Sequence, residues 1–355
     1  MKAIFRFIAH YQTFFALVSF VGGFAFGLWR EQPIDTDLAL LSQFCILVIV
    51  FLLIIKELSY RSHLWTPSTK LIPWWRFHEL FSHFLLGGLL RGYTVFFIKS
   101  AGFNGSLIFL VLITLLILAN ELPFVQNRGT LVRTVLWSLA LSCFVTYLIP
   151  KLMHRLDTTA FTIAIFITLI VILLASWLIR KRVTRELLRS YFLWPSLTTL
   201  MSYLTLYHLA LIPPVPLMLA RFEIAHRVQK EGKEWYLFQD DRFDKKLWEP
   251  ERFLYQAGDK VVAAFRLVAP AQFVEELVVR WEYKDKDWST TDMIPVKLIG
   301  GRKAGFRGST EKNQIWPGEW RVRLETLSGR EIGRLRFRIY PDSSLRVRDL
   351  KASRF

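Results

Sequence analysis

The first 220 residues contain seven apolar stretches, each about as long as a helix must be to cross a lipid bilayer. A spanning helix needs roughly 20 mostly apolar residues, because each residue rises about 1.5 Å through the hydrocarbon core. The predicted spans cover residues 12–29, 38–55, 79–98, 104–121, 131–149, 159–179 and 192–212. The sequence therefore predicts an α-helical polytopic membrane bundle of about seven spans, in a transmembrane domain of residues 1–220.

Basic residues are unevenly shared between the two sets of predicted loops. One set, which includes the N-terminus, carries 13 Lys and Arg, and the opposite set carries four. Because Lys and Arg collect in cytoplasmic loops, the N-terminus should be cytoplasmic. Seven spans then place the C-terminal domain outside the cytoplasm, and if the cell is a diderm bacterium that compartment is the periplasm. Arg91 leaves an alternative open, since a charge in mid-span is costly: if residues 77–90 lie along the interface, six spans remain and the domain is cytoplasmic.

The net charge does not require a nucleic-acid partner. Residues 1–220 carry 18 Lys and Arg against 8 Asp and Glu, a net charge of +10, and the remaining 135 residues carry 28 against 21, a net charge of +7. In a membrane protein, the excess of basic residues in cytoplasmic loops explains such a balance. We therefore expect the lipid bilayer as a partner and no nucleic acid.

The third predicted span carries an unusual set of ionisable side chains. Arg76, Glu79 and His83 are spaced so that they share one helical face, and Arg91 follows further along. Ionisable residues at membrane depth are typical of proton or ion pathways and of intramembrane sites. The alternative is structural, with Arg76 and Glu79 at the cytoplasmic boundary and His83 bonded to a neighbour.

No metal site, cofactor or catalytic residue is predicted. His78–His83, HELFSH, resembles the HExxH zinc motif but is one residue too long, so its two histidines point about 140° apart on a helix. No serine elbow or P-loop is found. An enzyme is therefore the less favoured class. Asn127 and Arg128, in a predicted cytoplasmic turn, are candidates for binding a partner or lipid headgroup, or else for capping two helices.

Residues 221–355 have the pattern of an extramembrane all-β domain. Three prolines in Leu211–Leu219 end the last span, and charged residues 221–234 suggest a short membrane-surface segment. Seven short alternating strands then predict an immunoglobulin-like β-sandwich. They cover residues 234–239, 252–256, 260–269, 273–284, 293–299, 319–326 and 331–340. The last strand bears an exposed comb of Arg334, Arg336 and Arg338, which would discourage edge-to-edge pairing.

A glycine-rich basic loop between residues 299 and 312 is the candidate binding surface of this domain. Its glycines permit positive φ or a close approach of the backbone to another group. The candidate ligand-binding or partner-binding residues are Arg302, Lys303, Arg307 and Lys312 in the loop and Arg321 in the strand that follows.

The chain resembles bacterial domain-of-unknown-function family 2914, in the subgroup in which the domain follows a multi-span membrane segment. The similarity is carried by Asn127–Thr130, Ile212–Leu217, Ile299–Arg302, Gly305, Arg307, Gly308, Thr310, Pro317, Gly318, Trp320–Val322, Glu325, Thr326, Gly329, Gly333 and Arg334. Phe306 and Ser309 stand where the family pattern has tyrosines, which weakens a sugar-binding or phosphate-binding role for those rings. The resemblance implies envelope location and architecture but no reaction.

Two main functions remain open, beside a sensor whose output would have to pass through a partner. The first is a bacterial inner-membrane protein without enzymatic activity, whose periplasmic domain binds an envelope protein, an anionic glycolipid or the cell wall through the basic loop. The second is a transporter or lipid-handling membrane enzyme that uses the ionisable residues of the third predicted span.

Overall fold

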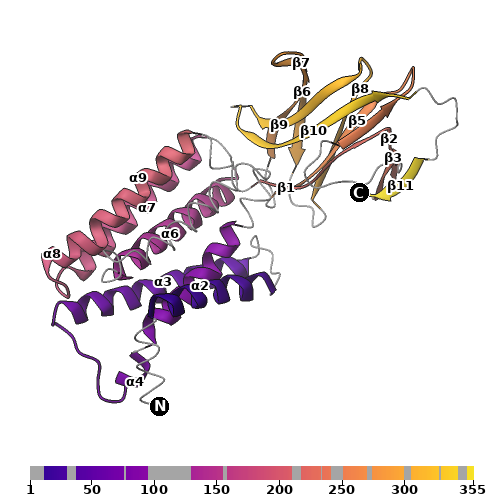
Figure 1. Ribbon diagram of the computed structural model, residues 1–355. Helices are drawn as coiled ribbons and strands as arrows, with labels where there is room; N and C mark the ends of the chain where they lie inside the picture. The colour runs from indigo at the N-terminus through magenta and orange to yellow at the C-terminus, as the bar shows by residue number, and fades with distance from the viewer. Residues whose placement is uncertain are drawn as a thin grey trace. The chain divides into compact units, whose positions relative to one another are not determined.

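The computed structural model describes residues 12–29, 37–75, 77–94, 129–154, 158–209, 217–232, 234–240, 251–269, 274–299, 305–327, 329–342 and 350–355. The chain folds as two compact units, a helical unit within residues 1–212 and a β unit made mainly of residues 213–355 (Figure 1). Each unit has its own buried core, so each is described by itself.

The helical unit contains long apolar helices and several shorter helical segments. Its elements are α2 (Gln12–Trp29), α3 (Asp37–Arg61), α4 (Ile72–Trp75), the helical segment 78–94, α6 (Gly129–Met153), α7 (Thr158–Ile179), α8 (Arg185–Leu188), the π-helix η2 (Arg189–Leu193) and α9 (Trp194–His208). The last three follow one another without a break, and Pro195 is accommodated because it lies near the start of α9.

Three helices of the described residues are long and apolar enough to cross a membrane, namely α3, α6 and α7. The prediction of about seven spans is therefore supported only in part. The first predicted span forms a helix whose apolar part is shorter, and the seventh forms α9, of 15 residues. The third is helical over 78–94, and the fourth, 104–121, lies outside the described residues.

Helix α6 is the centre of the helical unit, because small and hydroxyl side chains let its neighbours pack closely. The indole Nε1 of Trp137 donates to the carbonyl of Leu47 in α3, over 2.9 Å. On another face, Ser138 Oγ donates to Ser196 Oγ of α9 over 2.8 Å. These bonds satisfy polar groups that would otherwise be costly in an apolar surrounding.

Glycine allows α2 and the helical segment 78–94 to touch backbone to backbone. A Cβ atom on Gly23 would lie 2.0 Å from the carbonyl oxygen of Phe84, and one on Gly87 would lie 2.1 Å from that of Phe20. Real Cβ atoms do not come so close to a carbonyl oxygen, so only glycine permits this contact. This contact holds the helical segment that carries His78 and Glu79 against α2.

The β unit consists of two larger sheets and one smaller sheet. The strands are β1 (Met218–Ala225), β2 (Arg227–Glu231), β3 (Glu234–Asp240), β4 (Glu251–Tyr255), β5 (Val261–Val268), β6 (Val274–Lys284), β7 (Trp288–Ile299), β8 (Phe306–Lys312), β9 (Gly318–Thr326), β10 (Glu331–Pro341) and β11 (Leu350–Arg354). The sheet orders are β1-β5-β8, β4-β10-β9-β6-β7 and β11-β3-β2. All pairs are antiparallel except β10 with β4.

One apolar core joins the two larger sheets. Trp281, Trp320 and Phe337 from the five-stranded sheet are buried together with Phe265 and Leu267 from β5. These residues alternate along their strands with charged ones, which is the pattern of a strand with one buried face. The fold class is thus confirmed as helices followed by a C-terminal β-sheet domain.

Four strands lie where the sequence did not predict them. Residues 218–225 and 227–231, where we expected a membrane-surface segment, form β1 and β2, and β11 closes the small sheet. Residues 306–312 of the predicted basic loop form β8, paired with β5. Gly308 makes this pairing possible, because a Cβ there would lie 2.3 Å from the ring of Phe265. That glycine serves packing between strands.

We predict that Gly23→Ala destabilises the helical unit by about 1–3 kcal/mol, the usual cost of overpacking, because the added methyl group forces α2 away from Phe84. Thermal unfolding of the full chain in detergent measures this change. Gly22→Ala is the matched control, because nothing lies within 4 Å of a Cβ at that position. Equal melting temperatures for the two variants would contradict the close contact.

Candidate functional site

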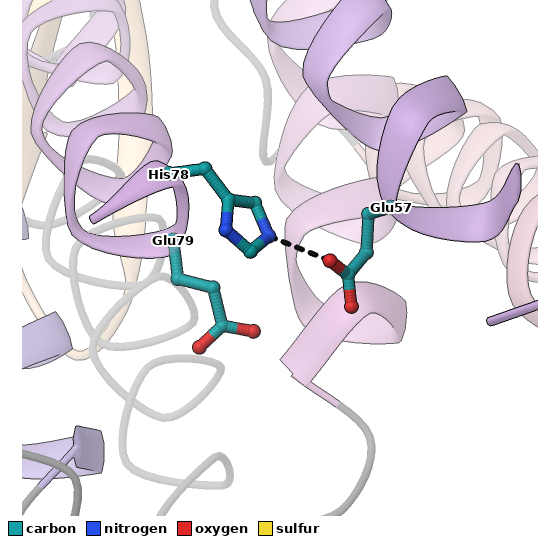
Figure 2. Close-up of side chains that lie close together, drawn as sticks. All are labelled: Glu57, His78 and Glu79. Atoms are coloured by element: carbon teal, nitrogen blue, oxygen red, sulfur yellow. Dashed lines mark hydrogen bonds and ion pairs between the residues drawn. The ribbon is translucent and has the colours of Figure 1, made fainter. Parts of the chain in front are cut away.

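A buried cluster of ionisable side chains joins three helices of the helical unit. Glu57 comes from α3, and His78 and Glu79 come from the start of the helical segment 78–94 (Figure 2). His78 Nε2 lies 2.6 Å from Glu57 Oε2. Glu57 is only 6% exposed, although it lies in an otherwise apolar helix. A carboxylate buried in this way requires compensating charge.

Two arginines supply that charge. Arg133 of α6, which is fully buried, places Nη1 2.9 Å from Glu79 Oε1 and Nη2 3.9 Å from Glu57 Oε1. Arg61, one turn after Glu57, donates from Nε to Glu57 Oε1 over 2.8 Å. Thr130 Oγ1 donates to the same carboxylate over 3.3 Å. Both carboxylates are therefore paired with guanidinium groups.

Both ring nitrogens of His78 lie close to oxygen atoms. Nδ1 lies within hydrogen-bonding distance of the Trp75 carbonyl oxygen, and Nε2 lies 2.6 Å from Glu57 Oε2. A carbonyl oxygen can only accept, which favours a hydrogen on Nδ1. With that hydrogen in place, the contact between Nε2 and Glu57 would need a second proton. The imidazole also stacks on the Trp75 indole, with centroids 4.0 Å apart, which favours a positive charge on the ring.

By distance alone, the same three side chains could hold a metal ion, since their ligand atoms lie within 4.8 Å of one another. The surrounding charge does not fit one. Arg133 contacts both carboxylates, and Arg61 contacts Glu57. A divalent cation would therefore be repelled by two guanidinium groups that already contact the carboxylate oxygens. Nε2 of His78 also lies 2.6 Å from Glu57 Oε2, a hydrogen-bond contact that a metal ion would have to displace.

The structure brings only part of the predicted intramembrane set into this cluster. Glu79 belongs to it. His83 lies one turn further along, with Nδ1 2.8 Å from the Glu79 carbonyl oxygen, and its buried Nε2 has no hydrogen-bond partner among the described residues. Arg91 lies three turns beyond Glu79, beside Gly27. Arg76, Asn127 and Arg128 lie outside the described residues.

Sequence reasoning missed Glu57, His78 and Arg133. Arg133 counted only as a cytoplasmic charge, and His78 was considered only as a partner of His83. A signal was present, because Glu57 directly follows a long apolar run, where a carboxylate is costly without a partner. Which helix supplied that partner could not be read from spacing.

The described residues of the predicted basic surface do not form one surface on the β unit. Lys312 is buried, where it pairs with Asp292 and lies over the Trp320 ring. Arg321 pairs with Glu282 on the opposite side of the five-stranded sheet from its core. Arg307 lies opposite Arg266 on the three-stranded sheet. Arg302 and Lys303 lie outside the described residues.

Glu282 is the acidic centre of the five-stranded sheet. It accepts hydrogen bonds from Arg321 and, over 2.9 Å, from Arg323. Burial would raise the pKa of Glu282, but the hydrogen bond from Arg321 and the charges of Arg323 and Arg321 outweigh burial and lower it. On the other sheet, burial and the charges of Arg221 and Arg307 lower the pKa of Arg266.

These features define a helical protein with membrane-capable spans and a C-terminal β-sheet domain. Residues 274–339 match the family model described as "Protein of unknown function (DUF2914)", so the C-terminal region carries a DUF2914 domain. The match runs from β6 into β10 and confirms the resemblance found in the sequence.

No curated protein matches the chain. Solved structures that match include β-glucosidase from Listeria innocua in complex with glucose, at 11% identity and a TM-score of 0.18, covering 34% of this chain and 16% of the enzyme. Another is the alkylpurine DNA glycosylase AlkC of Pseudomonas fluorescens bound to DNA containing an abasic site analog, at 14% identity and a TM-score of 0.18, covering 59% and 47%. This chain thus spans about a sixth of the β-glucosidase. At these TM-scores, the similarity to the two enzymes supports no inference about this chain.

We predict that Glu282→Gln destabilises the β unit by about 3 kcal/mol at neutral pH, because two guanidinium groups lose their anion. Since the folded pKa of Glu282 is lowered, its contribution is present above its unfolded pKa, near 4.5, and is lost as pH falls through the lower folded value. Denaturant unfolding of the full chain should show the two proteins converging in acid.

Glu311→Gln is the control for this prediction. Glu311 also pairs with a cation, Lys260, but both side chains are close to half exposed. Its loss should therefore cost less than about 1 kcal/mol. A constant difference between wild type and Glu282→Gln from pH 7 to pH 3 would contradict the assignment.

Proposed function

We propose that this protein is a bacterial inner-membrane transporter in which proton movement is linked to transport through the Glu57–His78 pair. The proposal rests on one observation: both ring nitrogens of His78 face oxygen atoms, so the Glu57–His78 pair is placed to hold a transferable proton inside the helical unit. Buried proton-carrying side chains of this kind are typical of pumps and transporters.

The geometry suggests how that proton is linked to movement of a helix. With the proton present, His78 bridges α3 to the helical segment 78–94. When the proton leaves, a lone pair on Nε2 faces the Glu57 carboxylate, and the attraction becomes a repulsion. Arg133 still holds Glu79, so the segment keeps one contact to α6 while it loses the one to α3. Loss of the proton thus favours a different position of the segment.

The remaining parts of the proposal concern topology. Seven apolar stretches and the alternation of basic loops support seven spans, with a cytoplasmic N-terminus and the β unit in the periplasm. An immunoglobulin-like arrangement of that unit is supported by its two larger sheets around a shared core. We infer no enzymatic activity and no cofactor.

The second candidate function is binding of an anionic envelope component or partner by the β unit. Lys312 and Arg321, two of its predicted residues, already pair with carboxylates of the same unit. The basic loop is therefore a weaker candidate than it was from the sequence. Lipid handling at the buried cluster has no observation in its favour beyond the cluster itself.

We predict that the full chain, reconstituted in liposomes with a trapped pH-sensitive dye, moves protons when a potassium diffusion potential is imposed. Glu57→Gln and His78→Gln should reduce the initial proton flux at least tenfold, because neither variant retains the ionisable pair.

Lys56→Gln is the matched control, because Lys56 is the exposed neighbour of Glu57 and its ammonium group lies over the Trp65 ring. It should keep the wild-type flux. A wild-type protein that moves no protons, or a Glu57→Gln protein that moves them equally fast, would overturn the proposal.

A further inference from the structure

The five-stranded sheet of the β unit has one face on the core and one face outside, and the outer face is strongly basic. Cross-strand register between β6, β9 and β10 forms three rows on that face. The rows are Arg280–Arg323–Arg334, Glu282–Arg321–Arg336 and Lys284–Glu319–Arg338. Seven of these nine side chains are cationic. We call them the arginine face.

Protection of a sheet edge does not account for the whole arginine face. The comb of Arg334, Arg336 and Arg338 was expected to have that role. In the structure, however, β10 pairs with β9 from Glu331 to Ile339 and with β4 from Phe337 to Pro341, so Arg338 lies between two partner strands. Arg338 therefore has no free edge to protect, and the cost of gathering like charges there needs another reason.

Most of the cations are neutralised within the sheet, but two are not. Glu282 and the buried Glu325 accept from Arg321, Arg323 and Arg280, Glu331 pairs with Arg334, and Glu319 pairs with Lys284. Arg336 and Arg338 are exposed, and neither forms an ion pair with any residue that the structure describes. Arg336 lies 6.0 Å from the Trp288 ring, and Arg338 lies 5.5 Å from the Tyr340 ring.

Exposed apolar side chains continue the same face onto β7. Met293 lies opposite Arg280, and Ile299 lies opposite Val274. All three apolar side chains, Met293, Ile299 and Val274, are at least half exposed. A surface that combines unpaired arginines with exposed apolar residues and a tryptophan is typical of proteins that dock on anionic lipid headgroups, since the cations meet phosphates and the apolar groups enter the interface.

We propose that the arginine face docks on the anionic phospholipid headgroups of a bilayer, with Arg336 and Arg338 as its main phosphate contacts. The chain itself supplies the bilayer, because it contains membrane-capable helices. Helix α9 ends at His208 and β1 begins at Met218, so the connection spans at most about 35 Å however it folds. Such a short tether gives the headgroups a high effective concentration at the β unit.

This proposal does not depend on proton transport. It also holds for either side of the membrane, since anionic lipids are the only partner it requires. A free acidic polymer, such as an anionic glycan, is the competing occupant. An acidic polymer would bind the cations but would have no use for the exposed Met293 and Ile299. The presence of these apolar side chains therefore favours a lipid surface as the occupant.

The test uses the full chain in nanodiscs. Cys45 and Cys143 are replaced by serine, and Met293→Cys carries an environment-sensitive dye beside the arginine face. Nanodiscs contain phosphatidylcholine alone, or phosphatidylcholine and phosphatidylglycerol at a ratio of about 3 to 1, each with a spin-labelled lipid as quencher. We expect at least twofold stronger quenching in the anionic nanodiscs, and we expect added salt to remove the difference.

The paired variant Arg336→Glu/Arg338→Glu should abolish the difference between the two lipid compositions. Arg227→Glu/Lys230→Glu is the matched control, because these two exposed cations also lie over aromatic rings, at 4.3 Å each, but on the small sheet. It should leave the difference unchanged. Circular dichroism and thermal unfolding verify that each variant is folded.

Three results would overturn the proposal. One is equal quenching in neutral and anionic nanodiscs, and another is a difference that survives in Arg336→Glu/Arg338→Glu. In the third, the dye responds to soluble dextran sulfate but not to phosphatidylglycerol, and Arg336→Glu/Arg338→Glu removes the response to dextran sulfate. That third result would assign the arginine face to an acidic polymer.

Discussion

The helical unit depends on the contacts of one buried guanidinium group. Arg133 enters from α6 and contacts Glu79 of the helical segment 78–94 and, at longer range, Glu57 of α3. Without it, two carboxylates would face each other in an apolar surrounding, where like charges repel strongly. With it, three helices meet at one point and His78 can share a proton with Glu57.

Much of the architecture could be predicted, because it depends on local patterns. Apolar stretches locate the helices, and alternation locates seven of the strands, each within a few residues except at the start of β7. Strands β1, β2 and β8 were missed because charged side chains and glycines hid the alternation. In β8 the glycine that looked like a loop residue is needed because the Phe265 ring occupies the space of a side chain.

The buried cluster could be predicted only in part, because its partners come from helices far apart in the sequence. Glu79 and His83 share a helix, so their spacing was informative. The pairing of Glu57 with Arg133 depends on how α3 and α6 pack, and a single sequence contains no record of that. Similarly, Lys312 looked like a member of a basic surface until its pairing with Asp292 placed it inside the domain. Net charge in a stretch of sequence does not reveal which charges remain unpaired after folding.

The glycine contact between α2 and the helical segment 78–94 has a mechanical consequence. Side chains between two helices normally change rotamer and absorb small shifts, but Gly23 and Gly87 leave no such layer. A displacement of the helical segment 78–94 toward α2 would therefore act directly on the backbone of α2. Helix α2 is thus an element from which a motion that begins where His78 meets Glu57 could be read.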